Sequence, residues 1–221
     1  MARPQLSDEA AAYVRELVLT GQLKAGEFLR VERLAEELDM SATPVREGLL
    51  ALRGEGFVEL APRRGFVVAE LSEEDVRDLF WVQAQIAGEL AARATRRMGA
   101  EQLDRLGTLQ AELVEALARD DLDEVERCNH AFHRVLNLAA AAPKLTWLLR
   151  TATRYVPQRF YHRVGGWPDA SLHDHAAILD GLRLADPDAV RLAMEKHIAH
   201  AGELLIAHAG LPGVAAAGDG D

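Results

Sequence analysis

Hydrophobic and polar positions between residues 28 and 56 follow the period of a helix in two short runs. The apolar positions are Leu34, Ala35 and Leu38 in the first run and Val45, Leu49 and Leu52 in the second. Thr43 and Pro44 are predicted as the N-cap and first position of the second helix, since proline has no N–H to lose there. Only residues 39–42 separate the two helices, so the second must turn sharply and expose its N-terminal end.

After Gly56 the period changes to two. The runs FVEL and GFVVA flank residues 61–64, which predicts a β-hairpin with Arg63 and Arg64 at its tip. Two guanidinium groups at a hairpin tip suit contact with a phosphate backbone. Two short helices and a basic hairpin have the layout of a winged helix-turn-helix.

Beyond Ser72 the strand signal ends and helical periodicity continues. We predict a mainly α protein with a winged helix-turn-helix domain over 1–70, a helical domain over 71–209 and a flexible tail over 210–221. The helical domain should contain six helices, at about 73–98, 101–119, 121–140, 144–164, 169–184 and 187–208.

The chain lacks the excess of basic residues that is usual for a DNA-binding protein. It carries 25 Lys and Arg against 35 Asp and Glu, a formal net charge of −10. DNA binding must therefore depend on arginines gathered on one face, because counterion release follows the phosphates contacted. The chain has a single cysteine, Cys128, no apolar run of membrane-spanning length and no signal-like segment at its start, which favours the cytoplasm.

Candidate metal chemistry lies in the helical half, which holds all eight histidines. On helical wheels His133, His175 and His197 each face the interior from a different helix, and Asn129 lies one turn before His133. Imidazoles with one oxygen ligand suit a divalent ion such as Zn, Ni, Co or Fe(II). The alternative for any one of them is a core histidine bonded to a backbone carbonyl.

The N-terminal pattern LxVERLAEEL, SATPVREGLLAL, FVEL and RRGFVV resembles the DNA-binding domain of the GntR superfamily of bacterial transcription regulators, over roughly residues 7–70. The resemblance implies that bases and phosphates are contacted by Arg30, Ser41, Thr43, Arg46, Arg64 and Gly65. Ala42 stands where the family usually has an arginine, which removes one expected base contact.

The helical half resembles the ligand-sensing domain of the FadR-like branch of that superfamily. NHAFHRVLN at 129–137, His175 with Ile178, and His197 carry the resemblance. It implies metal ligands at Asn129, His133, His175 and His197, with asparagine in a position where the family has an acidic or amide residue. Gln83 and Ala87 replace the family's arginine and glutamate in the effector pocket, so Gln83 and an arginine such as Arg154 are the expected effector contacts.

These observations predict a cytoplasmic homodimeric regulator, not an enzyme, that binds a palindromic DNA operator and senses a small metabolite, an organic acid, at a metal-containing pocket. The resemblance implies a repressor that its ligand releases, although the residues leave the sign open. One alternative is a repressor that senses the metal ion itself. The other is a metal-dependent hydrolase fused to a DNA-binding domain, which lacks a general base because Asp174 and Glu195 are expected to point to other faces.

Overall fold

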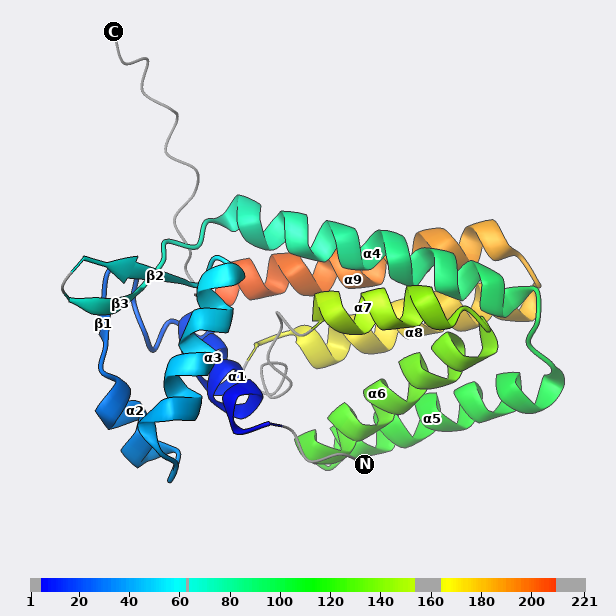
Figure 1. Cartoon of the computed structure of the whole chain (residues 1–221). Helices are drawn as coiled ribbons and strands as arrows, with labels where there is room; N and C mark the ends of the chain where they lie inside the picture. The colour runs from blue at the N-terminus through cyan, green and yellow to red at the C-terminus, as the bar shows by residue number, and fades with distance from the viewer. Residues whose placement is uncertain (1–4, 63, 154–163, 210–221) are drawn as a thin grey trace, which may run out of the picture. The chain divides into compact units, whose positions relative to one another are not determined.

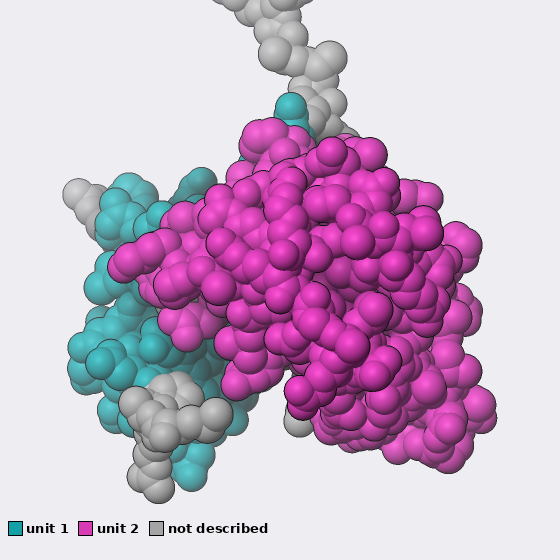
Figure 2. Space-filling view, turned by 90° about the vertical axis from the view of Figure 1, so that its right-hand side faces the viewer, with its two compact units in different colours: residues 1–75, 154–160, 209–221 teal, residues 76–153, 161–208 magenta. Residues whose placement is uncertain are grey.

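The computed structural model describes residues 5–62, 64–153 and 164–209. These form two compact units, which meet along the chain between Asp75 and Val76; Ala209, at the end of the last helix, is grouped with the first (Figure 2). Within the described ranges no helix combines the length and the apolar character needed to cross a bilayer.

The first unit is a three-helix bundle with a small sheet (Figure 1). Its elements are α1 (Leu6–Leu19), β1 (Phe28–Leu29), α2 (Val31–Glu37), α3 (Ala42–Gly54), β2 (Val58–Ala61) and β3 (Gly65–Val68). The sheet is antiparallel in the order β1-β3-β2, and Ala61 pairs with Gly65 across the hairpin. Helix α1 approaches α3 at Gly48, where a Cβ atom would lie 2.7 Å from the Ser7 carbonyl oxygen. The winged helix-turn-helix prediction is confirmed.

Three details of this unit differ from the sequence-based prediction. Helix α1 was not expected, although Ala10, Ala11, Val14 and Val18 form its buried face. Strand β1 adds a third strand to the hairpin. The N-cap of α3 is Ser41 and not Thr43, and Pro44 is its third residue. Proline is tolerated there because the first four N–H groups of a helix have no partner within it.

The second unit is helical throughout its described part. Its helices are α4 (Glu73–Thr95), α5 (Ala100–Ala118), α6 (Leu122–Ala139), α7 (Pro143–Ala152), α8 (Trp167–Arg183) and α9 (Pro187–Ala209). The predicted helix 144–164 corresponds to α7 and ends earlier, and residues 154–163 lie outside the described ranges. The prediction of a mainly α protein is therefore confirmed.

Aspartate side chains cap two of the helices in the second unit. Asp121 accepts a hydrogen bond from the Glu124 N–H at 3.2 Å at the start of α6. Asp186 accepts one from the Ala189 N–H at 3.0 Å at the start of α9. Such caps satisfy donors that the helix leaves free, so they define where the ligand-bearing helices begin.

Close helix packing supports the core of the second unit. Phe132, Leu136, Leu90, Leu106 and Ile178 are among its most buried side chains. Helices α4 and α9 meet at Gly202, where a Cβ atom would lie 2.7 Å from the Phe80 ring. The inner faces of α6, α8 and α9 carry His133, His175 and His197 beside this core.

Candidate metal centre and nucleic-acid interface

Three histidines from three helices meet inside the second unit. His133 of α6, His175 of α8 and His197 of α9 each offer one ring nitrogen within 4.8 Å of the nitrogens of the other two. The Nε2 atoms of His133 and His197 are 3.2 Å apart. The ring centroids of His175 and His197 are 4.9 Å apart. Residues separated by up to 64 positions in the chain therefore form one cluster.

Burial keeps the imidazoles of His133 and His175 neutral. His175 is 0% and His197 4% exposed. Burial, and secondarily the neighbouring His197, holds the pKa values of His133 and His175 well below the ordinary 6.5. A neutral imidazole is the form that binds a metal ion, so neither ring needs to lose a proton at neutral pH.

Buried polar atoms without hydrogen-bond partners occur in this cluster and one helical turn from it along α6. His175 Nε2 has none, and neither has Oδ1 of the buried Asn129, one helical turn before His133 on α6. Leaving such an atom unpaired costs about 1–3 kcal/mol. A cation bound by these atoms would remove that cost, so the donor set fits a divalent ion with nitrogen and oxygen ligands.

Asp174 lies beside this cluster, contrary to the expectation that it points to another face. Its Oδ2 is 3.2 Å from Nδ1 of the half-exposed His200 and 3.5 Å from Nδ1 of His197, the latter long for a hydrogen bond. Burial raises the pKa of Asp174, but the nearby His197 and His200 rings outweigh burial, and the pKa is lowered overall. The helical wheel placed Asp174 on another face because it assumes that α8 is buried along one stripe only. Helix α9 also covers the side of α8 that carries Asp174.

Gln110 on α5 is a neighbour of the cluster that the sequence did not indicate. Its Oε1 is 3.2 Å from His175 Nδ1, and its Nε2 donates to the Leu172 carbonyl oxygen at 3.0 Å. A glutamine in the middle of an amphipathic helix has no special spacing to the histidines. Only the packing of α5 on α8 brings it there.

Of the two residues expected to contact the effector, Gln83 lies within the described ranges and Arg154 does not. Gln83 of α4 is 3% exposed, and its Nε2 has no hydrogen-bond partner. A buried amide donor of this kind is suited to a ligand oxygen. Arg154 lies outside the described residues, as does Arg63 of the wing.

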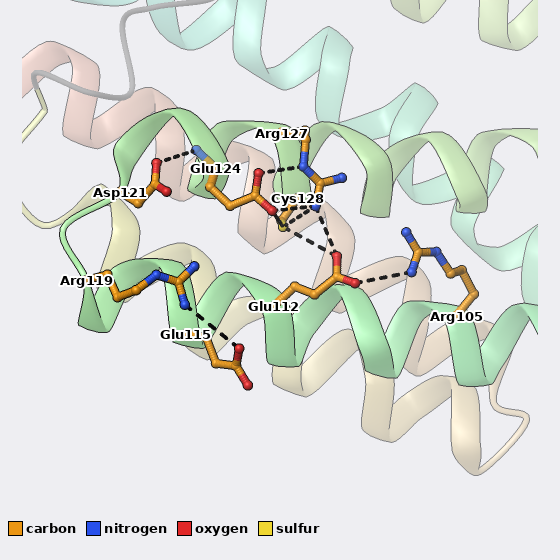
Figure 3. A network of polar contacts seen from close by, with 8 residues as sticks. All are labelled: Arg105, Glu112, Glu115, Arg119, Asp121, Glu124, Arg127 and Cys128. Atoms are coloured by element: carbon orange, nitrogen blue, oxygen red, sulfur yellow. Dashed lines mark hydrogen bonds and ion pairs between the residues drawn. The ribbon is translucent and has the colours of Figure 1, made fainter.

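A second group with potential metal ligands joins α5 and α6 (Figure 3). It consists of Glu112, Glu124 and Cys128, with one ligand atom each within 4.8 Å of the others. Arg127 Nη2 already lies among them, 2.6 Å from Glu124, 3.1 Å from Glu112 and 3.3 Å from the Cys128 sulfur. Because a guanidinium supplies the positive charge, we interpret this group as an ion-pair network.

In the first unit, three arginines line one surface hollow of about 510 Å³. Arg30 precedes α2, Arg46 is on α3 and Arg64 is at the hairpin, next to Gly65. The Arg64 guanidinium lies 5.8 Å above the ring of Phe28, and Arg46 is 3.4 Å from Glu32.

The start of α3 also carries exposed polar residues. Ser41 is its N-cap and Thr43 is in its first turn, and both are exposed. Helix N-termini and arginines are the usual contacts to DNA phosphates. The face therefore has positive charge and free donors despite the net negative charge of the chain.

Comparisons with known proteins agree with this architecture. Residues 6–68 match the family of bacterial regulatory proteins called the gntR family, and residues 78–200 match the FCD domain. The HTH-type transcriptional regulator McbR of Escherichia coli K12 is 30% identical over 175 residues, covering 77% of this chain and 79% of McbR. The HTH-type transcriptional repressor RspR of the same strain is 27% identical over 170 residues, covering 75% and 73%.

Solved structures show the same fold. The structure of E. coli McbR/YncC aligns with a TM-score of 0.66 at 20% identity, covering 92% of this chain and 98% of that one. A GntR regulator from Rhodococcus sp. RHA1 aligns with a TM-score of 0.57 at 18% identity, covering 91% and 97%. With its winged helix-turn-helix and FCD domain, the chain belongs to the FadR-like branch of the GntR family and is a DNA-binding transcriptional regulator.

Proposed function

We propose that this regulator holds a divalent metal ion in its FCD domain through Asn129, His133, His175 and His197, and senses a small metabolite there. The observation that carries the proposal is the meeting of three imidazoles from three helices, where His175 Nε2 is buried and has no hydrogen-bond partner. Asn129 Oδ1, one helical turn before His133, is likewise buried and unpartnered. A set of three nitrogens and one amide oxygen suits Zn or Ni. Such an ion would supply positive charge for binding an oxygen of the metabolite.

The metabolite is a small organic acid. Its carboxylate would bind the ion, and a second oxygen would accept a hydrogen bond from the Gln83 amide. Arg154, which the sequence places on the neighbouring predicted helix 144–164, is the further cation proposed for the same ligand. This assignment separates a metabolite sensor from a sensor of the metal ion alone, which would respond to the ion without any acid.

The DNA-binding half acts as one of a pair. We infer a cytoplasmic homodimer that binds a palindromic operator, with α3 of each copy in the major groove and each hairpin on the backbone. Base and phosphate contacts come from Arg30, Ser41, Thr43, Arg46, Arg64 and Gly65. Ligand binding in the FCD domain shifts the population between dimer arrangements that do and do not fit the operator, which releases repression.

Elemental analysis of protein purified without chelator tests the metal, together with thermal melts before and after chelation. We expect one divalent ion per chain and a melting temperature that falls on chelation. His133→Ala and His175→Ala should lose the ion, whereas His130→Ala and His173→Ala, which alter exposed residues, should keep it. A stoichiometric ion in His175→Ala would contradict the proposal.

Operator binding distinguishes the metabolite sensor from the sensor of the metal alone. Anisotropy with a labelled operator is measured on metal-free protein, on metal-loaded protein, and on metal-loaded protein with a panel of small organic acids. We expect the metal-loaded protein to bind DNA and an acid to release it. Control by the ion alone, with no response to any acid, would favour the metal-ion-sensing repressor.

A further inference from the structure

Gln110 occupies a position from which it controls the orientation of a proposed metal ligand. Its side-chain amide lies between the Leu172 carbonyl oxygen, at 3.0 Å, and His175 Nδ1, at 3.2 Å. A carbonyl oxygen only accepts hydrogen bonds, so the NH₂ group of Gln110 must face Leu172. The amide oxygen is then the atom left for the histidine.

The amide oxygen determines which ring nitrogen of His175 carries the proton. An amide oxygen only accepts, so Nδ1 must be the N–H that donates to it. A neutral imidazole has one N–H, which leaves a lone pair on Nε2. In the described part of the chain, His175 Nε2 is indeed buried and has no hydrogen-bond partner.

Phe132 holds the ring of His175 in place but cannot select between its two edges. The two rings are stacked with centroids 4.1 Å apart and planes 5° apart. A half-turn of the imidazole about its χ2 angle leaves that plane unchanged and exchanges the ring edges. Stacking therefore restricts the plane, whereas the hydrogen bond to Gln110 distinguishes the two orientations.

We propose that Gln110 is a positioning residue that keeps His175 in the Nδ1–H form, so that its Nε2 lone pair is presented to the metal ion. The inference rests on the metal site proposed above. Leu172 is one turn before His175 on α8, so the amide is anchored to the helix that carries the ligand. Partners of this kind typically change metal affinity about 10–100-fold when they are removed.

The experiment compares Gln110→Met, which has similar length and no acceptor, with Gln110→Glu, which keeps an oxygen for Nδ1–H. Gln85→Met, at an exposed glutamine of α4, is the matched control. Long-range ¹H–¹⁵N correlation spectra of metal-free protein, with histidine labelled, report the tautomer. The His175 signals are assigned by their loss in His175→Gln. Titration with Co²⁺, followed by its visible absorption, reports affinity and geometry.

We expect the Nδ1–H form of His175 in the parent, in Gln110→Glu and in Gln85→Met. In Gln110→Met the Nε2–H form should appear, and Co²⁺ affinity should fall about 10–100-fold. An Nε2–H ring in the parent, or an unchanged tautomer in Gln110→Met, would overturn the role of Gln110. A parent that binds no Co²⁺ would instead refute the metal site, while the metal-free spectra still decide the tautomer.

Discussion

His133 and His197 face each other through their Nε2 atoms, 3.2 Å apart, in the interior of the second unit. Two nitrogens at this distance share a single proton or direct their lone pairs at a common cation. A second proton between them would set two N–H groups against each other and leave one ring positively charged, away from water. The pair is therefore sensitive to acid when no metal is present.

We predict that the metal-free protein loses stability as the pH falls below about 6.5, the ordinary pKa of histidine. In the folded protein the pKa values of His133 and His175 are well below 6.5. Between these values and 6.5 the unfolded chain therefore binds protons that the folded chain does not bind. Stability then decreases by about 1.4 kcal/mol per pH unit for each such histidine until the folded pKa is reached. Denaturant unfolding of chelated protein at several pH values measures the slope.

Two variants serve as controls for this slope. His175→Gln removes one of the two groups and should flatten the pH dependence. His173→Gln changes an exposed histidine two residues earlier and should leave it as in the parent. Equal slopes in all three proteins would show that the buried histidines are not the source.

Arg46→Ala and Arg64→Ala should weaken operator binding in different ways. Arg46 is near the start of α3, so its loss should cost about 1–3 kcal/mol and relax sequence preference. Arg64 is at the hairpin, so its loss should weaken specific and scrambled DNA alike and reduce the salt slope by about one. Anisotropy at several salt concentrations measures both. Arg53→Ala, at the other end of α3, is the control, and parent-like binding by Arg46→Ala and Arg64→Ala would exclude this face.

Two glycine-to-alanine substitutions should have opposite effects on stability. Gly107 lies inside α5, and a Cβ atom there would meet nothing within 4 Å. Gly107→Ala should therefore raise the unfolding free energy by about 0.5–1 kcal/mol. At Gly202 a Cβ atom would lie 2.7 Å from the Phe80 ring, so Gly202→Ala should lower it by about 1–3 kcal/mol. Denaturant unfolding of both variants and the parent measures the two changes. If Gly107→Ala also lowered the unfolding free energy, another part of the protein would have to pack against α5 at Gly107.

The thiol of Cys128 should be unreactive in the folded protein. Burial raises its pKa to about 11, and its accessible surface is 0%. At mildly alkaline pH the thiolate is therefore rare and shielded. A chromogenic disulfide reagent should react with one thiol per chain in denaturant and with almost none in the native protein. Rapid reaction of the native protein would show that the network around Arg127 opens.

Residues 71–221 expressed alone should remain folded and dimeric. The second unit has its own hydrophobic core, which includes Leu90, Leu106 and Phe132. A winged domain of this size offers little surface for a stable dimer. Sedimentation equilibrium measures the state of the fragment, and a monomer at micromolar concentration would move the interface to the DNA-binding half.

The sequence predicted most of this fold because periodicity and capping residues were clear. The six helices of the second unit and the hairpin were expected near their observed positions. Strand β1 was not, since two residues carry no detectable alternation. Helix α1 was missed although its apolar positions have helical spacing, because the acidic and alanine-rich segment has no strong start signal.

The inward placement of the histidines was predictable, but their surroundings were not. A helical wheel shows that His133, His175 and His197 face the interior, and the three do meet. It cannot show what neighbouring helices bring to the same place. Gln110 is 65 positions before His175 in the sequence. Asp174 contacts His200 because α9 packs over the part of α8 that carries Asp174.

The seclusion of Cys128 has a practical consequence for studying the switch. It is the only cysteine in the sequence, so a cysteine placed at the exposed Glu47 of α3 would be the only thiol open to a probe. In the proposed dimer this gives one spin label on each recognition helix. Pulsed electron paramagnetic resonance would then report the separation of the two helices directly, with the native thiol left in place.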